Sequence, residues 1–203
     1  MPRALSPSEI EDFRDRLCEV ATRIFAEKGA EGFTMRQLAT ELSVSPMTPY
    51  RYFKDKDDIL AAVRARAFDQ FAEALEHAYE SGTTPVERSQ AVGLGYESFA
   101  RGHPEAYKLM FDVSQPNERD YPDLVRAGDR ARKTLTRHLE GLRDAGLIDG
   151  DPLLIGTVVW SALHGALMLQ LAGKLPAEYD FERIRNEIFN IVASAYGVRR
   201  PAT

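Results

Sequence analysis

Hydrophobic residues recur every three or four positions along most of this chain, and they almost never alternate with polar residues at every second position. The first spacing places apolar side chains on one face of a helix, whereas the second is typical of a strand. The pattern therefore predicts an all-α protein. We expect about nine helices, at residues 6–29, 34–42, 45–56, 57–79, 85–102, 104–113, 123–144, 152–173 and 181–196.

Two of these helical patterns, within residues 34–56, are short and separated by only two residues. Thr34 suits the N-cap of the first helix. Ser45, followed by Pro46, suits the N-cap and first position of the second. Only residues 43–44 remain for the turn. Such helices cannot lie antiparallel, so they cross steeply as a helix-turn-helix, and the second helix is free to enter the major groove of DNA.

The second short helix presents polar and basic side chains on the side away from the first. Thr48 and Tyr50 carry hydroxyls for phosphate oxygens or base edges, and the exposed Met47 suits a thymine methyl group. Helix pairs also occur in proteins that never bind DNA, where aromatic residues at this spacing belong to the core. The candidate DNA-binding residues are Thr34, Arg36, Ser45, Met47, Thr48, Tyr50, Arg51, Lys54 and Lys56.

The segment from Glu19 to Leu60 resembles the DNA-binding domain of the tetracycline-repressor (TetR) family of bacterial transcription regulators. The matching stretches read FAEKGAEGFTMRQLATELSVS and YRYFKDKDDIL. The resemblance implies that one group of residues faces the groove or the DNA backbone, and that Lys56 holds a phosphate. That group is Ser45, Met47, Thr48, Tyr50 and Arg51.

The chain departs from the family pattern at two positions. Ser43 stands in the turn where the family often has Gly, so we expect a slightly strained or differently shaped turn. Pro49 stands where the family usually has a branched aliphatic residue. Because proline lacks an N–H and disfavours helical geometry at Thr48, we expect a tight or irregular first turn in an otherwise intact helix.

Charge and cysteine content limit the other functions that the chain could have. The formal net charge is −5, and the acidic excess lies after residue 56, which confines DNA binding to the presented helices. The single cysteine, Cys18, excludes an internal disulfide and a cysteine-rich zinc site. The N-terminus has no apolar signal segment, so we expect a cytoplasmic protein. The four histidines lie on separate elements, so we expect no metal, cofactor or catalytic site, with His77 and His138 solvated.

The second domain, residues 57–203, is expected to bind an effector and form a dimer, with helix 57–79 connecting it to the DNA-binding domain at 1–56. Segment 152–173 contains no charged residue and is long enough to span a membrane. Polar residues within it and the absence of flanking basic clusters favour a buried core helix or a subunit interface. Ser161 and Gly165 at four-residue spacing, together with the last helix, favour a dimer interface, which the family resemblance also implies.

Aromatic and apolar residues of the second domain could line a small-molecule cavity, although they could equally form an ordinary core. The run WSALHGALML resembles the effector domain of one TetR subgroup. The candidate ligand-binding residues are Tyr96, Phe99, Tyr107, Met110, Phe111, Trp160, His164 and Met168.

Together these features predict a ligand-responsive transcriptional repressor. It would bind palindromic operator DNA as a homodimer and be released by a small apolar or amphipathic effector. The alternatives are an all-α carrier or enzyme that does not bind DNA, and a membrane-associated helical protein.

Overall fold

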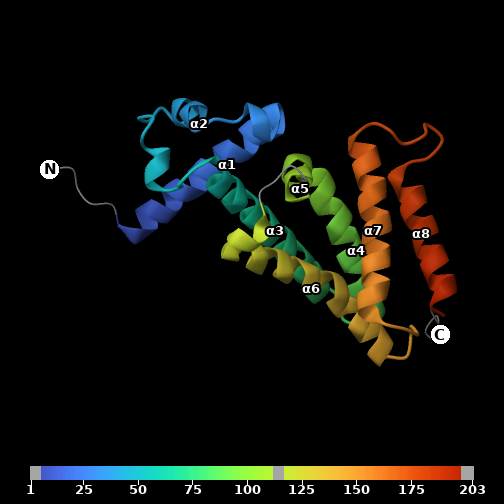
Figure 1. Cartoon of the computed structure of the whole chain (residues 1–203). Coiled ribbons are helices and arrows are strands. Elements are labelled where there is room, and N and C mark those ends of the chain that lie inside the picture. The colour runs from blue at the N-terminus through green and yellow to red at the C-terminus, as the bar shows by residue number, and fades with distance from the viewer. Residues whose placement is uncertain (1–5, 112–116, 198–203) are drawn as a thin grey trace. The chain divides into compact units, whose positions relative to one another are not determined.

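The computed structural model describes residues 6–111 and 117–197, and that part of the chain consists of helices joined by turns and loops, without strands (Figure 1). The predicted all-α class is therefore confirmed. The α helices are α1 (Pro7–Gly32), α2 (Met35–Glu41), α3 (Lys56–Ser81), α4 (Pro85–Gly102), α5 (Pro104–Met110), α6 (Pro122–Asp144), α7 (Pro152–Leu171) and α8 (Phe181–Ala195). Two short 3-10 helices, η1 (Pro49–Arg51) and η2 (Glu118–Asp120), complete the described elements.

Most helix ends agree with the predicted positions, and the differences have local causes. α1 breaks at Gly29, where φ is 69°, but one further helical turn follows to Gly32. The expected helix 104–113 ends at Met110, and residues 112–113 lie outside the described residues. The expected polar loop 114–122 contains η2, while residues 114–116 also lie outside the described part.

The chain divides into two compact units, each made of two separate segments. Unit 1 comprises residues 1–69 and 105–128, whereas unit 2 comprises residues 70–104 and 129–203. α3 and α6 each contribute residues to both units. The α5 segment thus belongs with the helix-turn-helix, because Leu109 is buried in the same hydrophobic cluster as Leu38 and Phe53.

A buried arginine ties three elements of unit 1 together. Arg64 of α3 is only 3% exposed. Its Nη2 donates to the Met110 carbonyl oxygen of α5 at 3.0 Å and also to the Glu118 carboxylate of η2. Because a buried guanidinium is costly unless it is paired and hydrogen-bonded, these partners fix α5 and η2 against α3.

Unit 2 is built around the antiparallel pair α7 and α8, which lie side by side (Figure 1). The core includes Leu139 and Leu142 of α6 and Ile155 of α7. Arg185 of α8 pairs with Glu97 of α4, and both side chains are largely buried. This ion pair and the apolar cluster hold α8 against the rest of the unit.

α7 is long and apolar enough to cross a membrane by length and composition, with a mean hydropathy of 1.6. Only a third of its most apolar stretch is buried. Leu154 and Val158 are exposed on one side, whereas Leu163 and Leu167 are buried on the other. The helix therefore packs on one face and leaves a second apolar face uncovered within the chain.

Candidate functional site

The turn between α2 and the next segment has a left-handed residue at Ser43, where we expected a slightly strained or differently shaped turn. Ser43 has φ of 54°, and it is the sole non-glycine residue with positive φ in the described part of the chain. Its N–H donates to the Thr40 carbonyl at 3.0 Å, and the Val44 N–H donates to the Ala39 carbonyl at 2.9 Å. This pair of bonds is a Schellman motif, which ends α2 and directs the chain sharply into the next segment.

The segment after the turn is not the α helix that we predicted for residues 45–56. It consists of turns and the 3-10 helix η1. Thr48 N–H bonds to the Ser45 carbonyl at 2.8 Å, and Arg51 N–H bonds to the Thr48 carbonyl at 3.1 Å. Pro49 explains the difference, because it has no N–H to donate to Ser45 and its ring crowds that carbonyl in an α helix. The irregularity that we expected in the first turn thus extends through the segment.

Apolar side chains anchor this segment to the domain on one side. Pro49 and Phe53 are buried, and Tyr52 packs against Phe13 of α1 with ring centroids 4.9 Å apart. On the opposite side, Met47 is 66% exposed and Tyr50 is 49% exposed. The packed inner side therefore holds the segment in place, and its outer side faces solvent.

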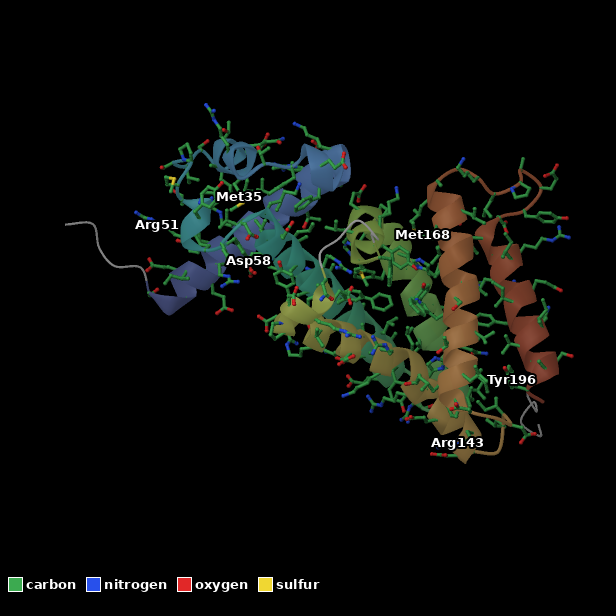
Figure 2. All side chains as sticks on the ribbon, in the orientation of Figure 1. Met35, Arg51, Asp58, Arg143, Met168 and Tyr196 are labelled. Carbon is green, nitrogen blue, oxygen red and sulfur yellow. The ribbon has the colours of Figure 1, made fainter. Side chains whose placement is uncertain are left out.

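The predicted DNA-binding residues all have side chains that reach the surface. Arg51 points into solvent, whereas Met35 points toward the core (Figure 2). Seven of the nine are exposed, and Thr48 and Lys56 are half-buried. Within the described residues, none of the cations of this set makes an ion pair: Arg36, Arg51, Lys54 and Lys56. By contrast, Arg66 in the same unit pairs with Asp15 and Glu19, each at 2.9 Å.

The start of α3, beside these cations, is held by its own acidic side chains. The Asp58 N–H donates to Asp55 Oδ1 at 2.9 Å, and the Lys54 N–H donates to Asp58 Oδ2 at 2.8 Å. Asp55 is thus a side-chain cap for the helix. These contacts fix the backbone that carries Lys54 and Lys56.

A cavity of about 320 Å³ lies within unit 2, between α4, α6, α7 and α8. Its walls are mostly aliphatic and aromatic, and Tyr196 lies at the C-terminal end of α8 (Figure 2). The best-defined polar feature of the wall is a pair formed by Ser89 of α4 and His138 of α6. The Ser89 Oγ and the His138 Nδ1 are 3.0 Å apart.

His138 corrects our expectation of a solvated helix residue. Its side chain is half-buried and lines the cavity. Burial lowers the pKa of His138 from 6.5 to about 4, and a hydrogen bond with the Leu135 backbone raises it by less. The imidazole is therefore neutral at pH 7. The sequence contained the signal, because His138 lies in register with Leu135 and Leu142 on the buried stripe of α6.

The predicted ligand-binding residues do not form one group. Tyr96 and Trp160 line the cavity, whereas the other six lie elsewhere. Phe99 of unit 2 packs against Phe71 with ring centroids 5.3 Å apart. His164 packs beside Trp160, with ring centroids 5.9 Å apart. The predicted residues Tyr107, Met110 and Phe111 belong to unit 1. Of these three, Tyr107 and Met110 are completely buried.

Burial also lowers the pKa of His164, whose side chain is half-buried. Across the residues that the structure describes, no group of three or more His, Cys, Asp or Glu side chains could hold a metal ion.

Sequence comparison matches two regions of the chain to one family. Residues 17–63 match the profile of bacterial regulatory proteins of the tetR family, and residues 89–190 match a tetracyclin repressor-like C-terminal domain. The chain belongs to the TetR family of bacterial regulators. This TetR-family chain is 27% identical over 143 residues to the HTH-type transcriptional regulator HbdR of Aromatoleum sp., a match that covers 70% of this chain and 62% of HbdR. It is 25% identical over 191 residues to an HTH-type regulator of Mycobacterium tuberculosis, covering 94% of this chain and 83% of that protein.

Solved structures agree with the TetR fold. A Rhodococcus protein of unknown function superposes with a TM-score of 0.80 at 25% identity, covering 98% of this chain and all of that one. The transcriptional regulator FadR of Bacillus subtilis, solved in complex with stearoyl-CoA, superposes with a TM-score of 0.72 at 20% identity. That match covers 89% of this TetR-family chain and 97% of FadR.

Proposed function

We propose that the protein is a cytoplasmic, ligand-responsive transcriptional repressor. It binds palindromic operator DNA as a homodimer through unit 1 and leaves the DNA when a small apolar or amphipathic effector fills the cavity of unit 2. The observation that carries this proposal is the outer face of residues 45–56. There, exposed hydroxyls and cations without acidic partners lie on a segment whose other side is anchored in the core.

The charge arrangement supports DNA as the partner of this face. Several other arginines of unit 1 have acidic partners, as Arg126 has Asp69 at 2.9 Å. Arg51, Lys54 and Lys56 keep their charge available in a chain whose net charge is −5. Such a local basic surface on an acidic protein attracts phosphate in one orientation only.

The exposed apolar face of α7 and α8 supports a dimer. Leu154 and Val158 of α7 and Ile191 of α8 are exposed, and Ile191 is 61% exposed. Ser161 lies on the same face of α7, and its hydroxyl donates to the Thr157 carbonyl at 2.8 Å. Since this hydroxyl is already satisfied within the helix, the face can be buried against a second copy without losing a hydrogen bond to water.

The cavity supports control by a ligand, and α3 offers a route for it. α3 and α6 supply residues to both units, and α6 also lines the cavity. A ligand that binds one arrangement of these helices more tightly than another shifts the population of DNA-competent dimers. A coupling of about 1–3 kcal/mol between the two sites is typical of such switches. FadR, with the same fold, was solved with stearoyl-CoA bound, which agrees with a ligand-binding role for the second unit.

The deciding experiment selects bound sequences from random duplex DNA with the purified full-length protein. We expect a palindrome whose half-sites lie about one helical turn apart, on the order of 34 Å. The dependence of operator affinity on salt is then measured for Lys54→Ala and for Lys133→Ala, an exposed lysine of α6 in unit 2. In Lys54→Ala, the loss of one phosphate contact per subunit should reduce the magnitude of the slope of log affinity against log salt concentration by about 2.

The control variant Lys133→Ala should keep the wild-type slope. Failure to enrich any sequence, together with no retardation of DNA at low salt, would overturn the repressor proposal and favour a helical carrier or enzyme that uses the same cavity. An unchanged slope in Lys54→Ala would remove that residue from the DNA contacts.

A further inference from the structure

The walls of the unit 2 cavity carry no formal charge. Aliphatic, aromatic and neutral polar residues line it, and no Asp, Glu, Lys or Arg of the described chain is among them. The ion pair between Glu97 and Arg185 lies in the same unit, but neither residue lines the cavity. An ionised ligand group inside would therefore meet no countercharge.

We infer that the effector is an uncharged, largely apolar molecule of about a dozen non-hydrogen atoms, with one hydrogen-bonding group that meets Ser89 and His138. This inference rests on the proposed function and adds the chemical class of the effector. It also assigns the polar end of the site to two residues that no sequence pattern singled out as ligand-binding.

The size follows from the volume of the cavity. A protein cavity of about 150 Å³ accommodates benzene, which has six heavy atoms. The unit 2 cavity is roughly twice as large, at about 320 Å³, and lies at the lower end of the range for small-molecule sites. A ligand of about twelve heavy atoms would occupy this volume, whereas the nucleotide part of an acyl thioester would have to lie outside it.

The absence of charge follows from the cost of desolvation. Burying an ionised carboxylate or ammonium group without a partner is strongly unfavourable, so such a ligand would neutralise itself or leave its charged end in water. An uncharged ligand can contact aliphatic side chains such as Leu139, Ile155 and Val159 without the free-energy cost of desolvating a charge.

The hydrogen-bonding group follows from the Ser89–His138 pair. The serine hydroxyl both donates and accepts, and a neutral imidazole has one donor and one acceptor nitrogen. The lowered pKa of His138 keeps the ring neutral at pH 7. The pair can therefore meet either a hydroxyl or a carbonyl of the ligand, and that contact orients an otherwise apolar molecule.

Trp160 allows the inference to be tested without DNA. It is the single tryptophan of the chain and lines the cavity, so its fluorescence reports occupancy directly. The probes are four unbranched molecules of nearly equal size: 1-decanol, undecane, decanoate and decylammonium. At pH 7.5 we expect 1-decanol to bind at least about tenfold more tightly than either ion, and about fivefold more tightly than undecane.

Two variants separate hydrogen bonding from simple occupancy. The double variant Ser89→Ala with His138→Phe should lose the preference for 1-decanol over undecane but still bind undecane. Gly93→Met should weaken all four probes, because a Cβ at Gly93 would lie 3.6 Å from Phe189 Cζ and a longer side chain would enter the cavity. Gly141→Met of α6 is the matched control, since a Cβ there has no atom within 4 Å.

Each outcome has a distinct meaning. Equal or tighter binding of decanoate or decylammonium, or probe binding that Gly93→Met leaves unchanged, would overturn the inference while the DNA measurements still stood. If the protein prefers 1-decanol as expected but bound decanol leaves operator affinity unchanged, the inferred chemistry of the cavity is supported. The same result would show that decanol does not release the protein from DNA. Loss of DNA binding altogether would refute the repressor proposal without changing the measured probe selectivity.

Discussion

Lowering the pH should destabilise this protein through His138. Because the folded-state pKa of His138 is about 4 against 6.5 for the free side chain, the unfolded chain binds a proton first as the pH falls. Stability linked to this residue is therefore complete above pH 6.5 and is lost between pH 6.5 and pH 4. At pH 5 the loss reaches up to about 2 kcal/mol, at 1.36 kcal/mol per pKa unit.

The assay is urea unfolding at pH 7.5, 6.5, 5.5 and 5.0, followed by Trp160 fluorescence and by circular dichroism at 222 nm. Wild type is compared with His138→Gln at one fixed protein concentration, because a dimer's stability depends on concentration. Carboxylates that titrate near pH 5 are common to both proteins, so they cancel in the difference. The variant should lose less stability than wild type on acidification, by up to about 2 kcal/mol at pH 5.

A second substitution makes the comparison specific. His77 of α3 is exposed, and His77→Gln should follow the wild-type curve. If His138→Gln and wild type lose the same stability between pH 7.5 and pH 5, the imidazole is not a buried neutral group. The reasoning that places it in the cavity wall would then fail.

Two further predictions concern the turn and the dimer. Ser43→Gly should stabilise the protein by about 0.5–1 kcal/mol in thermal unfolding, because the left-handed backbone costs serine more than glycine loses in unfolded-state entropy. The control Ser45→Gly, two residues away, should not stabilise the protein. A stabilisation of equal size in Ser45→Gly would contradict this reasoning. In the proposed dimer, Ile191→Arg places a charge in the apolar face of α8, so light scattering should find a monomer. Leu94→Arg, at a leucine of α4 that is 59% exposed, should leave the proposed dimer intact. A dimeric Ile191→Arg would contradict an interface at this face.

Local signals in the sequence predicted most helix starts correctly. The sequence predicts a first helix from residue 6, and Ser6 is the N-cap of α1, where it forms a capping box with Glu9. The Glu9 N–H donates to Ser6 Oγ at 3.3 Å, and Glu9 Oε2 accepts from the Ser6 N–H at 2.7 Å. α4 and α7 likewise begin at the expected prolines, Pro85 and Pro152. Such interactions span no more than three or four residues, so they can be read without knowing the fold.

Contacts between distant residues could not be predicted in the same way. Ser89 and His138 are 49 positions apart, and their pairing depends on how α4 and α6 pack. Arg64 is similar, because its partners Met110 and Glu118 lie 46 and 54 positions away. An apolar stripe shows that a helix face is buried, but it does not show which other helix packs against that face. The cavity and the placement of α5 in unit 1 are therefore visible only in the packed structure.

Met47, Tyr50 and Arg51 of residues 45–56 are exposed as expected, although the segment is not the expected α helix. A 3-10 helix turns by about 120° per residue and an α helix by about 100°. The directions of the side chains in the two helix types therefore diverge further with each added residue. Here η1 spans only three residues, and the Phe53 N–H still reaches the Pro49 carbonyl at 3.0 Å, four positions back. That single α-type bond keeps Pro49 and Phe53 on one buried side. Tyr50 and Arg51 consequently remain outside, where a nucleic acid can reach them.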